Sequence, residues 1–259
     1  MAESQPHGPA MVWCHKVEEK STKKIRVPGI EQGSRIYTVS KKPFPITMLS
    51  GDEFLSAWWQ AVLCHYALWK NDVHHRDVSP NNLMVYKLNG KWIGVLNDYD
   101  LSSTLHEGPT GNERTGTVPF MALDLLEKDA IDGNVSHLYR HDAESFIWVL
   151  VWICLRYSGG KLLHLREGRL LDDWLKVDVI RCRQIKSDFQ RQFRSEKLDP
   201  KVEPSLSHKS TSWKLARKCL HTLYHSPPDT DEKTTFEEWL QANMESVAPN
   251  LLPGSVDVL

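Results

Sequence analysis

The sequence predicts an α+β fold in which helices dominate, on three observations. Strand-forming residues at 83–88 and 91–96 flank Asn89-Gly90, the strongest short-range signal for a β-hairpin. Apolar residues recur at helical spacing within 50–71, and the segment 142–155 is almost wholly apolar, so both segments indicate helices. A chain of 259 residues is long enough to bury a sizeable core.

The N-terminal part of the chain carries little periodic pattern. Residues 1–34 are polar and are interrupted by proline and glycine, which we interpret as a loose N-terminal arm. We expect one short strand at 35–39 and then a linker that contains Pro43 and Pro45. Together these form a second segment, 35–49.

The first long helix has a recognisable start. Ser50-x-x-Glu53 is the pattern of a capping box, so we expect the helix to begin here and to end near Asn71. Its apolar face includes Trp58 and Trp69, and residues on such a face usually pack in the core.

The hairpin fixes which residues meet at its open end. A two-residue Asn-Gly turn sets the strand register, so Leu88 faces Lys91 and Asn82 faces Asn97. The next residue after Asn97 is Asp98, and the hairpin therefore brings Asp98 beside Asn82 although the two are far apart in sequence.

The remainder of the chain is a long loop followed by helices. Residues 98–124 lack periodicity and are rich in Ser, Thr and Gly, and a loop of this length in a compact domain is usually functional or disordered. The helix at 142–155 is apolar on all sides, which indicates a position in the centre of the fold. Further helical segments are expected at about 170–195, 210–225 and 234–246, before a tail at 247–259.

Composition excludes several classes of protein. Lys and Arg number 32 against 33 Asp and Glu, for a net charge of −1, so no basic excess points to nucleic acid or to an anionic membrane. The longest apolar run, 146–155, is too short to cross a bilayer, and no secretory signal is evident. Five scattered cysteines without a Cys-x-x-Cys pair favour a reducing compartment. We expect an intracellular protein, cytoplasmic or nuclear.

Polar side chains on either side of the hairpin suit phosphoryl transfer. This chemistry needs a carboxylate that orients the attacking hydroxyl and hard oxygen ligands for Mg²⁺. Asp77 can serve as the carboxylate, and Asn82 and Asp98 can serve as ligands at adjoining positions. Asp100 would face the same side as Asp98 in an extended segment and could add a ligand.

Four sequence motifs occur in order along the chain: His75-Arg-Asp-Val-Ser-Pro-Asn-Asn82, Asp98-Tyr-Asp100, Arg114-Thr-Gly-Thr-Val-Pro-Phe-Met-Ala122 and Arg140-His-Asp-Ala-Glu-Ser-Phe146. They resemble motifs of protein kinases, and their exact residues resemble those of the fungal-type protein kinases over roughly 35–225. Each motif alone is weakly specific, and four in the expected order are strongly specific. The segment 116–124 looks like the end of an activation segment, with Ala-Leu-Asp in place of the usual Ala-Pro-Glu.

The resemblance implies a Ser/Thr protein kinase that uses ATP and Mg²⁺. By this likeness Asp77, Asn82 and Asp98 are catalytic, Asn82 and Asp98 contact the nucleotide, and Asn82, Asp98 and Asp100 hold the metal. Asp142 corresponds to the aspartate that holds the catalytic-loop backbone, and Thr117 to the threonine placed against the catalytic aspartate. His75 is expected to support the loop and not to transfer protons.

Other expected kinase features are missing from the sequence. No Gly-x-Gly-x-x-Gly occurs, and no strand lysine has the expected spacing. We therefore expect a kinase-like helical C-lobe at 50–246 with its catalytic hairpin, and an N-lobe that is largely missing, with 35–49 as its remnant. Without these groups the chain is expected to be weakly active or inactive.

Two other functions stay open at this point. One is a pseudokinase, a binding or scaffold module without turnover. The other is a small-molecule phosphotransferase, against which Arg76 and the segment 116–124 argue. A protein substrate or partner is expected in the first two cases, and no nucleic acid or membrane. The oligomeric state and the phosphorylation of Ser102, Ser103, Thr104, Thr110 or Thr115 stay open.

Overall fold

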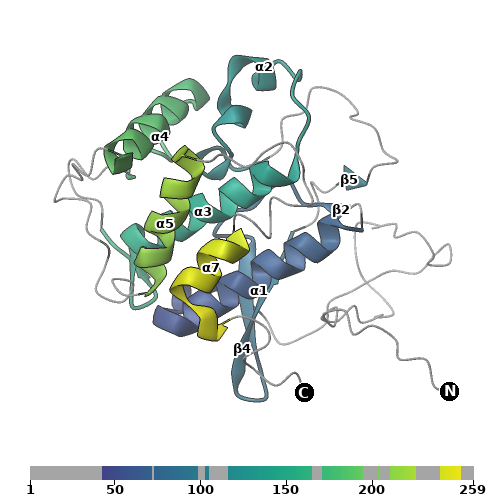
Figure 1. Cartoon of the computed structure of the whole chain (residues 1–259), viewed down its shortest axis with the longest axis vertical. Helices are drawn as coiled ribbons and strands as arrows, with labels where there is room; N and C mark the ends of the chain where they lie inside the picture. The colour runs from purple at the N-terminus through teal and green to yellow at the C-terminus, as the bar shows by residue number, and fades with distance from the viewer. Residues whose placement is uncertain are drawn as a thin grey trace. The chain divides into compact units, whose positions relative to one another are not determined.

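A computed structural model of the whole chain divides it into two compact units, Met1–Pro43 and Phe44–Leu259. The structure describes residues 43–71, 73–98, 103–104, 116–164, 171–194, 204, 211–225 and 240–251. Every element discussed below lies in the second unit (Figure 1). The predicted strand at 35–39 lies outside the described residues.

Helix α1 (Gly51–Trp69) forms where the apolar spacing predicts it. Ser50 takes the extended N-cap conformation, but its side chain makes no capping hydrogen bond, so the predicted capping box is wrong in that detail. The acidic residues Asp52 and Glu53 lie in the first turn, where negative charge stabilises the N-terminal end of the helix dipole. Trp58 and Trp69 are buried as expected.

The hairpin has the predicted register. Strands β3 (Leu83–Leu88) and β4 (Lys91–Leu96) pair antiparallel with Leu88 opposite Lys91. Beyond the ladder, the Asn97 backbone N–H donates to the Asn82 carbonyl at 2.8 Å. Strand β1 (Phe44–Pro45) adds to the free side of β3, which gives the order β1-β3-β4. The hairpin tip extends away from the helices (Figure 1).

Strand β4 lies directly against α1 at Gly94. A Cβ atom at Gly94 would lie 1.9 Å from the Ala57 carbonyl oxygen, so only glycine permits this approach of strand and helix. The Gly94 backbone N–H donates to Oε1 of Gln60 at 2.9 Å. This contact fixes the position of the hairpin along α1. It thereby also fixes the position of the hairpin's open end at Asn82.

Helix α3 (Tyr139–Arg156) is the centre of the core. All but two of its residues are buried, which matches the prediction of an all-apolar central helix. It packs against α1, against α5 (Thr211–His225) and against the 3-10 turn η2 (Val118–Phe120). The indole N–H of Trp58 donates to the Phe146 carbonyl at 3.2 Å, so α1 and α3 are also joined by a buried hydrogen bond.

The first of the C-terminal helices is shorter than the pattern predicted, and the predicted helix at 234–246 lies partly outside the described residues. The described helices are α4 (Val179–Arg194), α5 and α7 (Ala242–Val247), and a 3-10 turn, η6, follows at Pro249–Leu251. The predicted helix at 170–195 is wrong at its start, because 171–176 form turns. Asp178 accepts a hydrogen bond from the Arg181 backbone N–H at 2.9 Å, so it acts as the N-cap from which α4 begins.

The segment 98–124 was predicted as a loop without regular structure, and its described parts correct that prediction. Strand β5 (Ser103–Thr104) pairs antiparallel with β2 (Val73–His74), and the 3-10 turns η2 and η3 (Asp124–Leu126) follow. Strands of two residues leave no period-2 signal, so the sequence pattern could not reveal this pairing. The remaining short elements are η1 (Ile46–Met48), α2 (Lys128–Ile131), β6 (Tyr157–Ser158) and β7 (Lys161–Leu162).

The described helices include none that combines the length and the apolar character needed to span a bilayer. No disulfide joins the four cysteines that the structure describes.

Candidate functional site

The candidate site is the loop 75–82, which connects β2 to the hairpin. Residues 75–79 have no regular secondary structure, and the chain then turns at 80–82, with the Asn82 N–H donating to the Ser79 carbonyl at 3.0 Å. Arg76 has a φ of 68°, a left-handed conformation that is uncommon for a residue with a Cβ atom. Such strain is held only where surrounding contacts fix it, and the loop has several.

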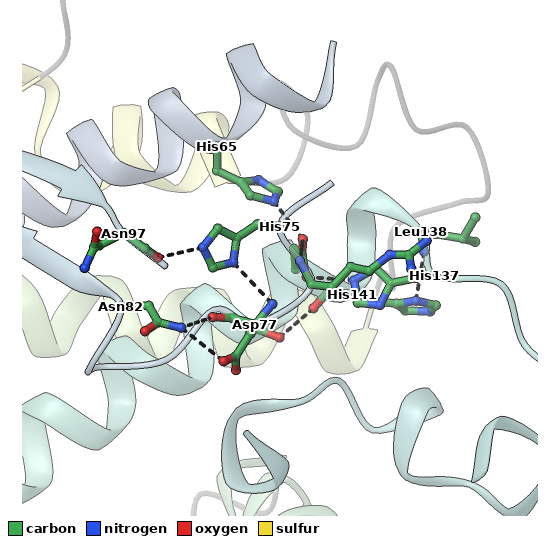
Figure 2. A network of polar contacts seen from close by, with 11 residues as sticks. His65, His75, Asp77, Asn82, Asn97, His137, Leu138 and His141 are labelled. Carbon is green, nitrogen blue, oxygen red and sulfur yellow. Dashed lines mark hydrogen bonds and ion pairs between the residues drawn. The ribbon is translucent and has the colours of Figure 1, made fainter. Parts of the chain in front are cut away.

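His75 is a structural support of this loop, as expected. It is buried, its Nε2 donates to the Asn97 carbonyl at 2.9 Å, and its Nδ1 accepts from the Asp77 backbone N–H at 3.2 Å. These two bonds require a neutral imidazole with the proton on Nε2. Burial lowers the pKa of His75, partly opposed by the bond to Asn97 and the charge of Asp142, so the neutral form is favoured. The ring thereby ties the loop to the end of β4 (Figure 2).

Asp77 is the half-buried carboxylate at the centre of the site. Its Oδ2 accepts from Nδ2 of Asn82 at 3.1 Å, and the same Nδ2 donates to the Asp77 carbonyl at 2.8 Å. Its Oδ1 accepts from both the backbone N–H and the hydroxyl of Thr117, each at 2.8 Å. The end of the loop, where it joins the hairpin, and the segment after residue 115 therefore both bond to one carboxylate. Figure 2 shows the contact between Asn82 and Asp77. The contact of Thr117 with Asp77 is the one that the resemblance implied.

The hairpin places Asp98 at the same end of the sheet as Asn82. Asp98 follows Asn97, whose N–H bonds to the Asn82 carbonyl, and it is exposed with a φ of 61°. Asp100, the third predicted metal ligand, lies outside the described residues. Among the residues that the structure describes, no three His, Cys, Asp or Glu side chains come together as a preformed metal site.

Asp142, near the start of α3, holds the loop from below. Its Oδ2 accepts from the backbone N–H of Arg76 at 3.3 Å, as the resemblance implied. The same carboxylate accepts from Nε2 of His65 and Nε2 of His137, both at 2.7 Å. Burial by itself would raise the pKa of Asp142, but the two histidines outweigh burial and lower the pKa well below its usual value. Asp142 is therefore ionised and links α1, the loop and the start of α3.

The sequence analysis did not single out either histidine partner of Asp142. His65 lies on the apolar face of α1 and is fully buried, so its spacing suggested a core residue. His137 comes from the irregular segment before α3. A polar residue on an otherwise apolar helix face was the one available signal, because a buried imidazole requires a hydrogen-bond partner.

The segment from Gly116 to Asp124 folds against the loop and α3. A Cβ atom at Gly116, whose φ is 123°, would lie 3.1 Å from the Arg76 carbonyl oxygen. Further along, the Leu123 N–H donates to Oε1 of Glu144 at 2.9 Å. Asp124 forms a partly exposed ion pair with Arg140 at 2.8 Å. This segment thus has fixed contacts at both of its ends.

Comparison with known proteins supports the resemblance. Residues 34–154 match the family described as fungal protein kinase. The dual specificity mitogen-activated protein kinase kinase mek-1 of Caenorhabditis elegans is 25% identical over 186 residues, which cover 68% of this chain and 46% of that protein. The chain thus spans less than half the length of this relative. The predicted resemblance to fungal-type protein kinases is confirmed over residues 34–154, and the mixed helices and strands fit a kinase-like α+β fold.

Proposed function

We propose that this site transfers the terminal phosphoryl group of ATP to a Ser or Thr hydroxyl of a protein. The observation that carries the proposal is the convergence of Asn82 and Thr117 on the Asp77 carboxylate. A fixed, half-exposed carboxylate is what orients an attacking hydroxyl and accepts its proton. In this proposal the unit Phe44–Leu259 corresponds to the kinase lobe that carries the catalytic loop.

Asn82 and Asp98 are the residues that would hold Mg²⁺, with Asp100 as a further ligand. Both hydrogen bonds from Asn82 to Asp77 use Nδ2, so the amide oxygen Oδ1 is not engaged with Asp77. An amide oxygen and a carboxylate are the hard ligands that Mg²⁺ binds, and this ion completes its shell with water and phosphate oxygens. Bound there, the ion would neutralise phosphate charge, while Asp77 positions the hydroxyl.

A protein hydroxyl is favoured over a small alcohol by the segment at 116–124. It lies against the catalytic loop through Thr117, beside the carboxylate, where an extended peptide could be guided. The alternative of a small-molecule phosphotransferase gives this segment no role.

Phosphoryl transfer is tested with the full chain, Mg²⁺, labelled ATP and peptide libraries that present Ser/Thr or Tyr. Asp77→Asn is expected to lower the rate at least about a hundredfold, the usual contribution of such a group. Asp188→Asn, an exposed aspartate on α4, is the matched control and should leave the rate unchanged. Because the sequence contains no Gly-x-Gly-x-x-Gly, we expect slow turnover, so ATP binding is measured by thermal shift in the same samples.

The other functions give different results in this experiment. A magnesium-dependent thermal shift with ATP but no labelled peptide would point to a binding module. Transfer to aminoglycosides or choline and not to peptides would point to a small-molecule kinase. Peptide phosphorylation that Asp77→Asn leaves intact would contradict the role given to Asp77.

A further inference from the structure

A lysine lies fully buried beneath the segment 116–124. Lys186 projects from α4, has none of its surface exposed, and donates from Nζ to the Met121 carbonyl. The ammonium lies over the Trp148 ring at 4.5 Å from the centroid and is 5.8 Å from that of Trp174. Lysine is almost never fully buried unless it is paired, so this position requires an explanation.

Glu144 of α3 also contacts Trp148, and it is the acidic group whose charge acts on Lys186. Its Oε1 accepts from the Trp148 indole N–H at 2.8 Å and from the Leu123 backbone N–H at 2.9 Å. Burial raises the pKa of Glu144, and the charge of Lys186 opposes that rise. Lys186, Trp148 and Glu144 therefore form one cluster, which we call the Lys186–Glu144 anchor.

The anchor binds both kinds of backbone group in one short stretch of chain. Lys186 donates to the Met121 carbonyl, and Glu144 accepts from the N–H of Leu123, two residues later. Replacing buried groups of opposite charge by apolar residues is often neutral or stabilising, so packing alone does not require these two charges. What the pair supplies beyond packing is a fixed position for the backbone.

That position is transmitted to the catalytic carboxylate through a single turn. The 3-10 turn η2 joins Thr117 to Met121, with the Phe120 N–H donating to the Thr117 carbonyl at 2.9 Å. Phe120 itself is buried against Trp152 of α3, with ring centroids 5.5 Å apart. The stretch between Asp77 and the anchor therefore has little freedom to move.

We propose that the Lys186–Glu144 anchor is a positioning device that holds the segment 117–123, and with it Thr117, against Asp77 for the binding of a protein substrate. The role in substrate binding rests on the proposed function, whereas the mechanical coupling does not. Lys186 and Glu144 are positioning residues, because they act through the segment and contact none of the reacting groups.

The coupling is tested by hydrogen exchange, which needs no catalysis. Lys186→Met keeps the length of the side chain but removes the charge and the donor. We expect the backbone amides of Thr117 and Leu123 to exchange at least tenfold faster, while amides at 146–155 of α3 keep their protection. Lys214→Met removes an exposed lysine of α5 and should change neither. Wild-type exchange of Thr117 and Leu123 in a folded Lys186→Met chain would overturn the proposal.

Two further measurements keep the proposal testable if Lys186→Met does not fold. Glu144→Gln leaves Lys186 without its counter-charge and should also accelerate exchange at Leu123. In the wild-type chain, under mild denaturant, the amides of Thr117 and Leu123 should open together with those of α4. Opening of the segment well before α4 would overturn the proposal without any variant.

A kinetic readout separates the anchor from the proposed function. If peptide phosphorylation is observed, either anchor variant should raise KM for the peptide at least fivefold and leave KM for ATP unchanged. If no phosphorylation is observed while the exchange results hold, the anchor stands as a structural coupling and the proposed function fails by itself. Equal KM values for the peptide in variant and wild type would remove the role in substrate binding.

Discussion

At the scale of single residues, the histidines around α3 differ in what their hydrogen bonds require. His65 and His137 donate to Asp142, whereas His141 accepts from the Leu138 backbone N–H through Nδ1 at 3.1 Å. The His141 N–H donates back to the Leu138 carbonyl at 3.0 Å, which closes the first turn of α3. An accepting Nδ1 requires an imidazole that carries no proton on that atom.

His141 should therefore make the fold sensitive to acid. Burial, with the charges of His137 and Arg140, lowers the pKa of His141 to about 4 from 6.5. A group with a lowered folded pKa contributes stability above its unfolded pKa and loses it as the pH falls through the folded one. We expect the free energy of unfolding to decrease by about 3 kcal/mol between pH 6.5 and pH 4 on account of this residue.

Denaturant unfolding of wild type and of His141→Asn across that pH range measures this contribution. The asparagine oxygen can replace Nδ1 as acceptor for the Leu138 N–H, so the variant should fold at neutral pH. The difference in free energy between the two proteins should shift with acid in favour of His141→Asn. Parallel pH profiles would show that His141 does not titrate differently in the folded and unfolded chains.

At the scale of elements, the contact of β4 with α1 depends on one glycine. A Cβ atom at Gly94 would overlap the Ala57 backbone, and backbone cannot move aside as a flexible side chain can. Gly94→Ala is expected to reduce the free energy of unfolding by about 3 kcal/mol, the upper part of the usual range for overpacking. It should also loosen the Asn97–Asn82 pairing, which can be followed by amide exchange at Asn97.

Gly90→Ala provides the comparison for that prediction. Gly90 has open space around its Cα atom but a φ of 82°, so alanine there meets backbone strain and no clash. The expected loss is about 1 kcal/mol, without an effect on Asn97. Equal losses from the two substitutions would mean that strand geometry, and not the close approach to α1, limits Gly94.

The elements that the sequence predicted well are those whose signal is local. Asn89 and Gly90 both have positive φ, as the predicted turn requires, and the register of β3 and β4 follows from that turn alone. The apolar run of α3 likewise could be recognised without knowledge of its neighbours.

The Lys186–Glu144 anchor could not be predicted, because nothing near Lys186 in sequence indicates that α4 would bury it beside Glu144 of α3. The same holds for His65 and His137, whose shared partner Asp142 is distant from His65 along the chain.

For the candidate site, the hairpin allowed one part of the geometry to be predicted. The adjacency of Asn82 and Asn97 followed from strand register, and the structure has it. The Thr117 contact followed from the resemblance and not from local pattern. The metal-binding roles of Asn82 and Asp98 stay predictions, and that of Asp100 falls on a residue outside the described part of the chain.

At the scale of the whole folded unit, α3 connects the candidate site with the C-terminal helices. Its start holds the loop 75–82 through Asp142, and its length packs against α1 and α5. Phe146, fully buried near its middle, contacts Trp58 and His65 with ring centroids 6.3 and 5.4 Å away. Phe146→Ala is expected to reduce the free energy of unfolding by about 3–5 kcal/mol.

Because α3 packs against both the candidate site and the C-terminal helices, the loss of stability in Phe146→Ala should affect both regions together. Tryptophan fluorescence and far-ultraviolet circular dichroism are expected to report coincident unfolding transitions in wild type and in Phe146→Ala. Ile180→Ala, which truncates an exposed side chain of α4, is the control and should change stability by less than about 0.5 kcal/mol. Separate transitions for the two probes in Phe146→Ala would show that the helix does not unify the fold.

In the proposed reaction, the hydrogen bonds of Asp77 limit the side from which a substrate hydroxyl can approach this carboxylate. Each carboxylate oxygen offers two lone pairs. Among the described residues, Thr117 takes both of those on Oδ1 and Asn82 takes one on Oδ2. The hydroxyl of a substrate would then either donate to the remaining lone pair of Oδ2, next to the Asn82 amide, or replace Thr117 as a donor to Oδ1. If Thr117 keeps its bonds to Oδ1, the proposed substrate hydroxyl would reach Asp77 only from the side of Oδ2.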